Sequence, residues 1–317
     1  MMNKTIHLWF ASAIALCCVS TTSSAQAQIV PDTTVNTSVT PQGNTSVITG
    51  GTVAQTNLFH SFEQFSVPTG STAYFNNAPE IQNIMTRVTG SSISNIDGLI
   101  QANGTANLFL LNPNGIIFGP NASLNIGGSF LASTASSLNF VDGTQFSATA
   151  PQTTPLLTIS VPMGLQFEGT TGSILNQSQA TNSRGEIVGL QVQPGKALAL
   201  LGGDVRSDGG ILQAPGGRVE LGGVAGAGTI GLNVDVNSLR LSFPDGVTLA
   251  DVSLTNGTQV NVRAGGGGSI TVNAQNLNMG EGSQLQAGID SLLGSPDSKA
   301  GDIEIYVIGA INLTDNS

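Results

Sequence analysis

Cysteine is almost absent from this chain, and so is histidine. Of 317 residues, two are cysteines and two are histidines. Cys17 and Cys18 are adjacent within an apolar N-terminal segment, and His60 is the one histidine beyond that segment. The rest of the chain therefore has no disulfide framework, and a lone histidine is a poor basis for a zinc site. Packing and hydrogen bonds must hold the fold, and we expect no metal, no cofactor and no catalytic residue.

Charge is also scarce. Charged residues make up 9% of the sequence, against about 25% in an average domain. Nine basic residues stand against 19 acidic ones, so the formal net charge is −10. The basic residues are scattered, which argues against nucleic acid as a partner and against docking on anionic lipid. With 41 glycines and 39% apolar residues, the composition favours a β protein with many turns over a disordered chain.

The N-terminus has the features of a cleaved secretion signal. Lys4 provides the positive start, residues 6–19 form a short apolar core, and Ala25-Gln26-Ala27 is a small-x-small cleavage site. We therefore predict cleavage after Ala27, with Ala25 and Ala27 as the recognised small residues and Gln28 as the first mature residue. Export by the general secretion machinery is the expected first step. No later segment is long and apolar enough to span a membrane.

Short apolar runs bounded by Gly, Asn, Asp or Pro recur along the chain, and helical periodicity is hard to find. In the second half, apolar pairs at i and i+2 recur at intervals of 20 to 21 residues, and after a longer gap the pattern returns near the end. The pairs are Leu198/Leu200, Val219/Leu221, Leu239/Leu241, Val260/Val262 and Ile303/Ile305. This period predicts an all-β parallel β-helix with three short strands per coil, and on the order of a dozen coils fit the mature chain.

The segment Asn112-Pro113-Asn114-Gly115 interrupts an apolar run between Leu111 and Ile116. Pro113 removes a backbone donor and Gly115 adds chain entropy, so a buried helix does not tolerate the segment. Asn first, Pro second and Gly fourth suit a type I turn. The residues therefore predict two short strands joined by a tight turn, which is an ordinary corner of a β-helix.

Two long stretches resemble a known family. They are NLFHSFEQFSVPTGSTAYFNN at residues 57–77 and IQNIMTRVTGSSISNIDGLIQANGTANLFLLNPNGIIFGPNASLNIGGSFLASTA at residues 81–135. Together with the signal, they resemble the filamentous-haemagglutinin-type N-terminal secretion domain of two-partner secretion exoproteins, and most of all its cyanobacterial members. The resemblance covers about residues 29–145.

This resemblance implies a right-handed parallel β-helix with a β cap at its N-terminal end. It also implies an outer-membrane Omp85-like two-partner transporter as partner. The family's secretion motif falls on Asn112, Pro113, Asn114, Gly115 and Ile116. The turn is therefore expected to serve recognition by the transporter as well as the fold. The family's second motif, Asn-Pro-Asn-Leu, has no intact copy in this sequence.

We expect three regions: a signal peptide over residues 1–27, a secretion domain over residues 28–145, and continuing β-helix coils over residues 146–317. More coils or another domain are expected after Ser317. The leading functional prediction is a non-enzymatic segment of a secreted, cell-surface exoprotein such as an adhesin. Its secretion domain would nucleate β-helix folding as the chain emerges, because closing the first coil is the costly step.

Two other functions stay open. A β-helical enzyme acting on polysaccharides needs carboxylates and basic residues in one groove. Eight basic residues spread over the mature chain make binding of acidic sugars unfavourable. The second alternative is a self-sufficient adhesin passenger with its own translocation domain, for which the sequence contains no candidate strands.

Two motifs have simpler structural explanations. GAGTIG at residues 226–231 matches the dinucleotide pattern G-x-G-x-x-G, but the alternation after it predicts a strand where that site needs a helix. His60 is expected to be a polar residue among the phenylalanines of the cap, and not part of a catalytic set.

Overall fold

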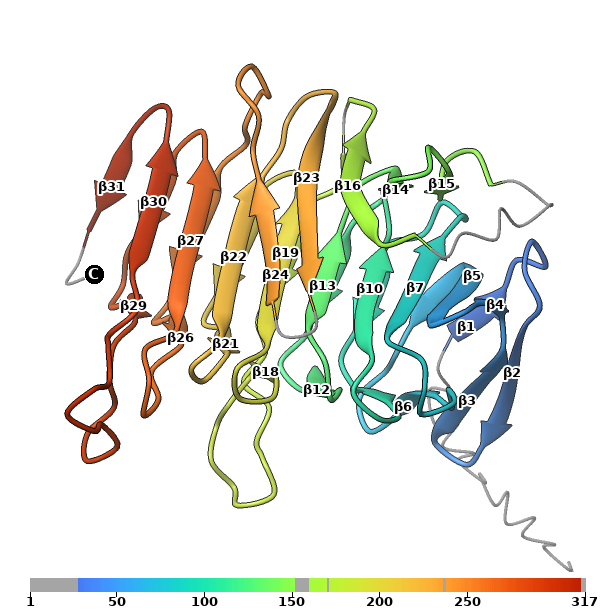
Figure 1. Cartoon of the computed structure of the whole chain (residues 1–317), viewed down its shortest axis with the longest axis horizontal. Coiled ribbons are helices and arrows are strands. Elements are labelled where there is room, and N and C mark those ends of the chain that lie inside the picture. The colour runs from blue at the N-terminus through green and yellow to red at the C-terminus, as the bar shows by residue number, and fades with distance from the viewer. Residues whose placement is uncertain (1–27, 152–159, 170, 236–237, 315–317) are drawn as a thin grey trace, which may run out of the picture.

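The computed structural model describes residues 28–151, 160–169, 171–235 and 238–314. These residues form 31 strands and no helix. Most strands are short and stack in parallel, each on its counterpart from a neighbouring coil, so that the chain winds into a long β-helix (Figure 1). The predicted all-β parallel β-helix is confirmed. Since the described residues contain no helix, none is long and apolar enough to cross a membrane.

Three sides of the coil are built from parallel sheets. The first side is the main sheet, ordered β1-β5-β7-β10-β13-β19-β22-β27-β30, with β4 beside β5. Its strands are β1 (Gln28–Pro31), β4 (Thr52–Ala54), β5 (Asn57–Ser66), β7 (Asn83–Val88), β10 (Asn107–Leu111), β13 (Phe130–Ser133), β19 (Ala197–Gly202), β22 (Arg218–Gly223), β27 (Ser269–Ala274) and β30 (Ile303–Val307). Apart from β1 and β4, all neighbours in this sheet are parallel.

The second side is one sheet ordered β31-β28-β25-β20-β17-β11-β8. Its strands are β8 (Ser94–Ile96), β11 (Ile116–Phe118), β17 (Ile174–Asn176), β20 (Val205–Asp208), β25 (Val252–Thr255), β28 (Leu277–Met279) and β31 (Ile311–Leu313). The third side consists of two sheets, ordered β12-β9-β6-β3-β2 and β18-β21-β26-β29. Their strands are β2 (Thr37–Gln42), β3 (Thr45–Gly50), β6 (Thr72–Phe75), β9 (Leu99–Ala102), β12 (Ser123–Asn125), β18 (Leu190–Gln191), β21 (Ile211–Gln213), β26 (Gln259–Asn261) and β29 (Gln284–Gln286).

A fifth, antiparallel sheet lies over the outer face of the main sheet (Figure 1). We call it the covering sheet, and its order is β15-β14-β16-β23-β24. Its strands are β14 (Ser137–Phe140), β15 (Gln145–Ser147), β16 (Pro162–Phe167), β23 (Gly228–Asp235) and β24 (Ser238–Ser242). The sequence did not predict this layer.

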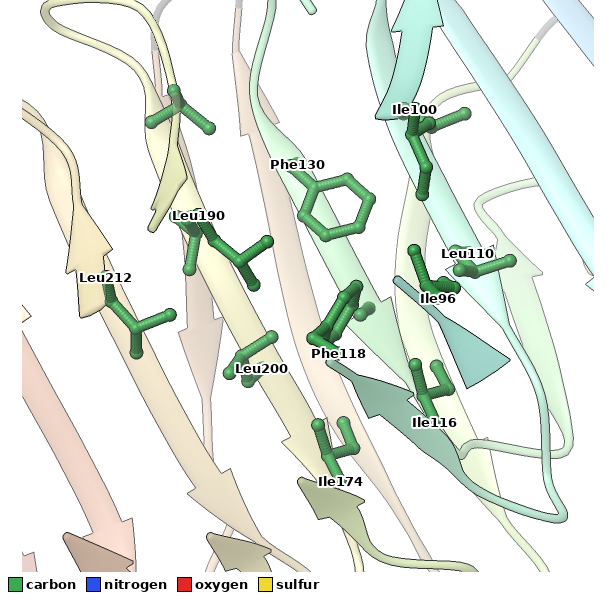
Figure 2. Packing of buried hydrophobic residues seen from close by; sticks show 14 of the residues in the cluster. Ile96, Ile100, Leu110, Ile116, Phe118, Phe130, Ile174, Leu190, Leu200 and Leu212 are labelled. Atoms are coloured by element: carbon green, nitrogen blue, oxygen red, sulfur yellow. The ribbon is translucent and has the colours of Figure 1, made fainter. Parts of the chain in front are cut away.

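The chain therefore has two apolar cores. The inner core fills the coil, where aliphatic and aromatic side chains of successive rungs stack on one another (Figure 2). In it, Phe118 and Phe130 meet edge to face with ring centroids 6.0 Å apart. The outer core lies between the main sheet and the covering sheet and contains Phe109, Leu131 and Phe167. Strands β10, β13 and β19 are consequently buried on both faces, which is why they lack the polar alternation of a half-exposed strand.

The uniform period of 20 to 21 residues is wrong as a rule for the whole chain. Leu198, Val219, Ile270 and Ile303 are in register on adjacent strands of the main sheet. Leu198 and Val219 are 21 positions apart, but Val219 and Ile270 are 51 apart, because β23 and β24 are inserted between β22 and β25. Leu239/Leu241 lies in β24 of the covering sheet, and Val260/Val262 belongs to the third side at and after β26. In the described residues the main sheet has eight parallel rungs, β5 to β30, and not about a dozen.

Antiparallel strands close the N-terminal end of the β-helix, as the expected cap requires. β1 pairs antiparallel with β5, β2 forms a hairpin with β3, and β4 pairs antiparallel with β5. Beside the cap, the side-chain amides of Asn57, Asn83 and Asn107 stack in a row, the amide file, which fixes the register of the first rungs. Asn83 donates to Asn57 and Asn107 donates to Asn83, each over 3.0 Å. Each amide thus satisfies its neighbour on the next rung inside a buried layer.

His60 lies in the cap among phenylalanines, as predicted. It is 1% exposed, and its ring lies against Phe62 and Phe75 at centroid distances of 6.1 and 5.6 Å. Its Nδ1 is 3.1 Å from Thr37 Oγ1. Burial lowers the pKa of His60 from 6.5 to about 3, because the charged imidazole loses its solvation. The folded chain therefore holds His60 neutral.

We expect acid to destabilise the fold through His60. The unfolded chain binds a proton there near pH 6.5 and the folded chain near pH 3. The free energy of unfolding should therefore fall as the pH drops between these values, by at most about 1.4 kcal/mol per pH unit. Urea unfolding of the wild type and of His60→Gln, compared between about pH 7 and pH 4, measures the difference in slope. Equal slopes for the two proteins would contradict the assignment.

Candidate functional site

The predicted turn is the corner that joins β10 to β11. Gly115 N–H donates to the Asn112 carbonyl over 3.1 Å, which closes the four-residue turn. Asn114 is not among the residues with positive φ, so a type II turn is excluded and the expected type I geometry fits. Gly115 has φ of +126°, a conformation that side chains with a Cβ rarely adopt.

Asn112 is fully buried, and its side-chain amide is satisfied on both sides. Nδ2 donates to the Ser92 carbonyl over 3.0 Å and to Ser94 Oγ over 2.9 Å. Oδ1 accepts from the backbone N–H of Asn114 over 3.0 Å. The side chain therefore pins the turn internally and also holds it to the preceding coil.

Backbone bonds hold the corner to the following coil. Gly172 N–H donates to the Pro113 carbonyl over 2.8 Å, and Ile116 N–H donates to the Ser173 carbonyl over 3.1 Å. A Cβ on Gly172 would lie 2.3 Å from the carbonyl carbon of Asn114, so only glycine fits there. The Ile116 side chain points into the inner core (Figure 2). The corner is thus one layer of a stack, with bonded coils on both sides.

The surface that this corner offers is small. Of the five motif residues, Asn114 is exposed and Pro113 half-buried, while Asn112, Gly115 and Ile116 are buried. Ile93, on the preceding coil, is 43% exposed, although it is a large apolar residue. A Cβ on Gly115 would lie 3.7 Å from the Ile93 side chain, so the two corners adjoin. A partner that reads the motif directly can therefore contact Asn114, Pro113 and Ile93, which we call the corner surface.

The signal residues fall partly outside what can be described. Ala25 and Ala27 lie outside the described residues, whereas Gln28 is the first residue of β1.

The glycine motif at residues 226–231 runs into β23, an antiparallel strand, as its alternation predicts. Among the described residues, no group of three or more His, Cys, Asp or Glu side chains is placed to hold a metal ion.

Arg87, which no sequence motif marks, is a buried arginine that joins three distant segments. Its Nε donates to Ser61 Oγ over 2.8 Å, Nη1 to the Ser147 carbonyl over 2.7 Å and Nη2 to Thr34 Oγ1 over 2.8 Å. Its Cζ lies 4.3 Å from the ring centroid of Phe146. Arg87 therefore ties the cap, the main sheet and the covering sheet together. The sequence signal was a lone charge in the apolar strand NIMTRV.

Asp32 completes this joint through hydroxyl groups. Its Oδ2 accepts from Ser61 Oγ over 2.5 Å and from Thr89 Oγ1 over 2.7 Å, and its Oδ1 accepts from Thr34 N–H over 2.9 Å. Burial raises the pKa of Asp32, but these hydrogen bonds together lower it below its usual value. Burial lowers the pKa of Arg87 to about 10, against the attraction of Asp32, so the guanidinium stays charged at neutral pH.

Comparison with known proteins gives one family, and the solved structures that match include two secretion domains. A family model described as the TPS secretion domain matches residues 27–272. The crystal structure of the HMW1 secretion domain from Haemophilus influenzae is 18% identical, with 91% of this chain and 72% of that chain covered and a TM-score of 0.46. The crystal structure of the filamentous hemagglutinin secretion domain is 16% identical, with 90% and 99% covered and a TM-score of 0.41. No curated protein matches.

The buried amide at the corner predicts a large difference between two neighbouring asparagines. Asn112→Ala should lower the free energy of unfolding by about 2–3 kcal/mol, because it leaves the Ser92 carbonyl and the Asn114 N–H without partners. Asn114→Ala removes an exposed side chain and should cost less than about 1 kcal/mol. Urea unfolding of both variants measures this. Equal losses would contradict a structural role for Asn112.

Proposed function

The chain belongs to the TPS secretion domain family, and we propose that an Omp85-like outer-membrane transporter captures it in the periplasm and delivers it to the cell surface. The chain is the N-terminal domain of a two-partner secretion exoprotein. The observation that carries the proposal is the family match over residues 27–272. We retain as predictions the cleavage between Ala27 and Gln28 and a boundary of the secretion domain near residue 145.

Folding of the coils is proposed as the driving force of export. Each strand of the main sheet pairs with the strand of the coil before it, as β7 does with β5 and β10 does with β7. An emerging coil therefore finds its template in place and buries its apolar side chains on arrival. Beyond Cys17 and Cys18 the sequence contains no cysteine, so no disulfide can close a loop before the chain has passed a narrow pore.

Nucleation is the costly step, because the first loops lose entropy on closing before any coil is in place for them to stack on. We propose that the cap and the Arg87 joint form this nucleus. Arg87 bonds to groups 26, 53 and 60 residues away. Forming these bonds therefore requires the cap, β5 and β15 to be in place together.

For recognition, we propose two separate roles within the motif. Asn112, Gly115 and Ile116 act through the fold, because they are buried. The corner surface is the part that the transporter touches. It is small and uncharged, with an apolar and an amide side chain, which suits a transient contact that must be released.

The exported protein is proposed to be a non-enzymatic surface protein such as an adhesin. Support comes from the family, which serves transport.

Co-expression tests the transporter dependence. With its cognate transporter, the full chain should reach the cell surface or the medium. Without the transporter it should stay in the periplasm and be degraded. Immunoblots of the separated fractions measure the distribution. Equal amounts outside the cell in both strains would contradict the proposed function.

A second experiment addresses the corner surface. Asn114→Arg should lower export by about tenfold, which corresponds to about 1.4 kcal/mol of lost recognition. The variant loses the exposed hydrogen bond from Asn114 Nδ2 to the Gly90 carbonyl, so its free energy of unfolding should fall by less than about 1 kcal/mol, and urea unfolding should show that it still folds. Asn125→Arg, an equal change at an exposed position of β12, is the control and should be exported normally. Normal export of Asn114→Arg would exclude the corner surface from recognition.

A further inference from the structure

Two adjoining hollows lie where β24 packs beside the main sheet. One, of about 280 Å³, is lined by side chains that include Arg218, Glu220, Arg240 and Tyr306. The other, of about 250 Å³, lies at the corners that precede β19, β22 and β27 and is lined by Lys196, Arg218, Arg240 and several glycines. Because both hollows share Arg218 and Arg240, we treat them as one site, the basic groove.

The basic groove brings together three basic residues of an acidic protein, beside the carboxylates of Glu220 and Glu304. The described residues contain eight Lys and Arg, and three of them, Lys196, Arg218 and Arg240, line this groove. In the sequence these three are spaced 22 positions apart and looked scattered. The fold corrects that interpretation, because Lys196 directly precedes β19, Arg218 begins β22, and β24 carries Arg240 alongside both strands.

Arg218 is held in place before any ligand arrives. Its Nη1 lies 3.4 Å from Glu220 Oε1 and donates to Thr271 Oγ1 over 3.2 Å. The side chains of Arg218 and Glu220 are 16% and 2% exposed. Burial raises the pKa of Glu220 to about 7, although Arg218 and Arg240 act in the opposite direction. The guanidinium thus has a fixed orientation, which lowers the entropy cost of binding an anionic group.

The remaining lining is unlike that of a site for a bare anion. Phe243 and Tyr306 supply aromatic surface, with Tyr306 55% exposed. Thr271 and Asn273 supply a hydroxyl and an amide, and Glu304 supplies a carboxylate that can accept hydrogen bonds. A ligand that matches this lining carries an anionic group beside hydroxyl donors and an apolar ring face.

The charge of the whole chain restricts the ligand further. With a net charge of −10, the protein repels a dense polyphosphate such as nucleic acid, whose binding relies on many basic contacts. A chain with widely spaced anionic groups on a neutral scaffold avoids this repulsion. Acidic oligosaccharides have this arrangement.

We propose that the basic groove binds an acidic oligosaccharide, with a carboxylate or sulfate between Arg218 and Arg240 and a sugar ring against Tyr306. The corner end of the groove, with Lys196 and its glycines, receives the next part of the sugar chain. This goes beyond the export function, since the groove lies on strands far along the β-helix from the Asn112 corner.

Calorimetry on the full chain tests the proposal, with hyaluronan and dextran sulfate oligosaccharides as carboxylated and sulfated probes and neutral dextran as the negative probe. At least one acidic probe should bind and dextran should not. Arg240→Gln should weaken that binding by about tenfold, because it removes one charge-assisted contact. Arg240 is exposed, so the variant should fold. Arg206→Gln, the same change at a side chain that is 63% exposed on β20, is the matched control and should bind like the wild type.

Any one of several results would overturn the proposal. One is that neither acidic probe binds, or that dextran binds as tightly as the acidic probes. Another is that Arg240→Gln and Arg206→Gln weaken binding by the same factor. A third is that inorganic sulfate, at the same molar concentration as the oligosaccharide, displaces it completely. Binding of duplex DNA or of anionic lipid vesicles with the same dependence on Arg240 would also overturn it. Weaker oligosaccharide binding by Tyr306→Ala, with the affinity kept in Tyr306→Phe, would support the placement of the sugar ring against Tyr306.

Discussion

Pairing between equivalent strands of successive coils is the interaction on which this structure depends. Neighbouring parallel strands stand about 4.8 Å apart, so every backbone bond between coils also brings two inward side chains into contact. Leu108, Phe130 and Leu198 lie in register in this way. A coil alone covers none of its inner face, so the backbone bonds and the apolar column form together or not at all. The Asn112 corner and the amide file at Asn57, Asn83 and Asn107 follow the same rule with polar groups.

The second dependence is the covering sheet, which makes one side of the β-helix different from the others. Because of it, the outward side chains of β10, β13 and β19 are buried and mostly apolar, and the main sheet is the buried centre of a layered structure. The covering sheet also brings Phe146 and the Ser147 carbonyl to Arg87, and Arg240 to Arg218. Both the proposed nucleus and the basic groove therefore lie where this added layer meets the coil.

The sequence predicted the fold class and the position of the critical turn, because both depend on local chemistry. Asn112, Pro113 and Gly115 identify a tight turn wherever they occur in this order. Alternation of period two shows that one face of a strand is buried, but not what buries it. Leu239 and Leu241 therefore matched Leu198 and Leu200, although they face a different core. Asn112, Arg87 and Arg218 each have partners that lie 18 to 60 residues away in the sequence, and no local pattern indicates these distant partners.

The short strand at the cap has a consequence for molecules that meet outside the cell. Parallel stacks invite head-to-tail fusion into fibres, because each end presents unpaired backbone groups. Here β1, four residues long and containing Pro31, lies antiparallel on β5. A second copy that approaches this edge meets the short strand β1, in which Pro31 has no backbone N–H, and not the longer strand β5. Growth of the main sheet into a fibre through this edge is thereby disfavoured.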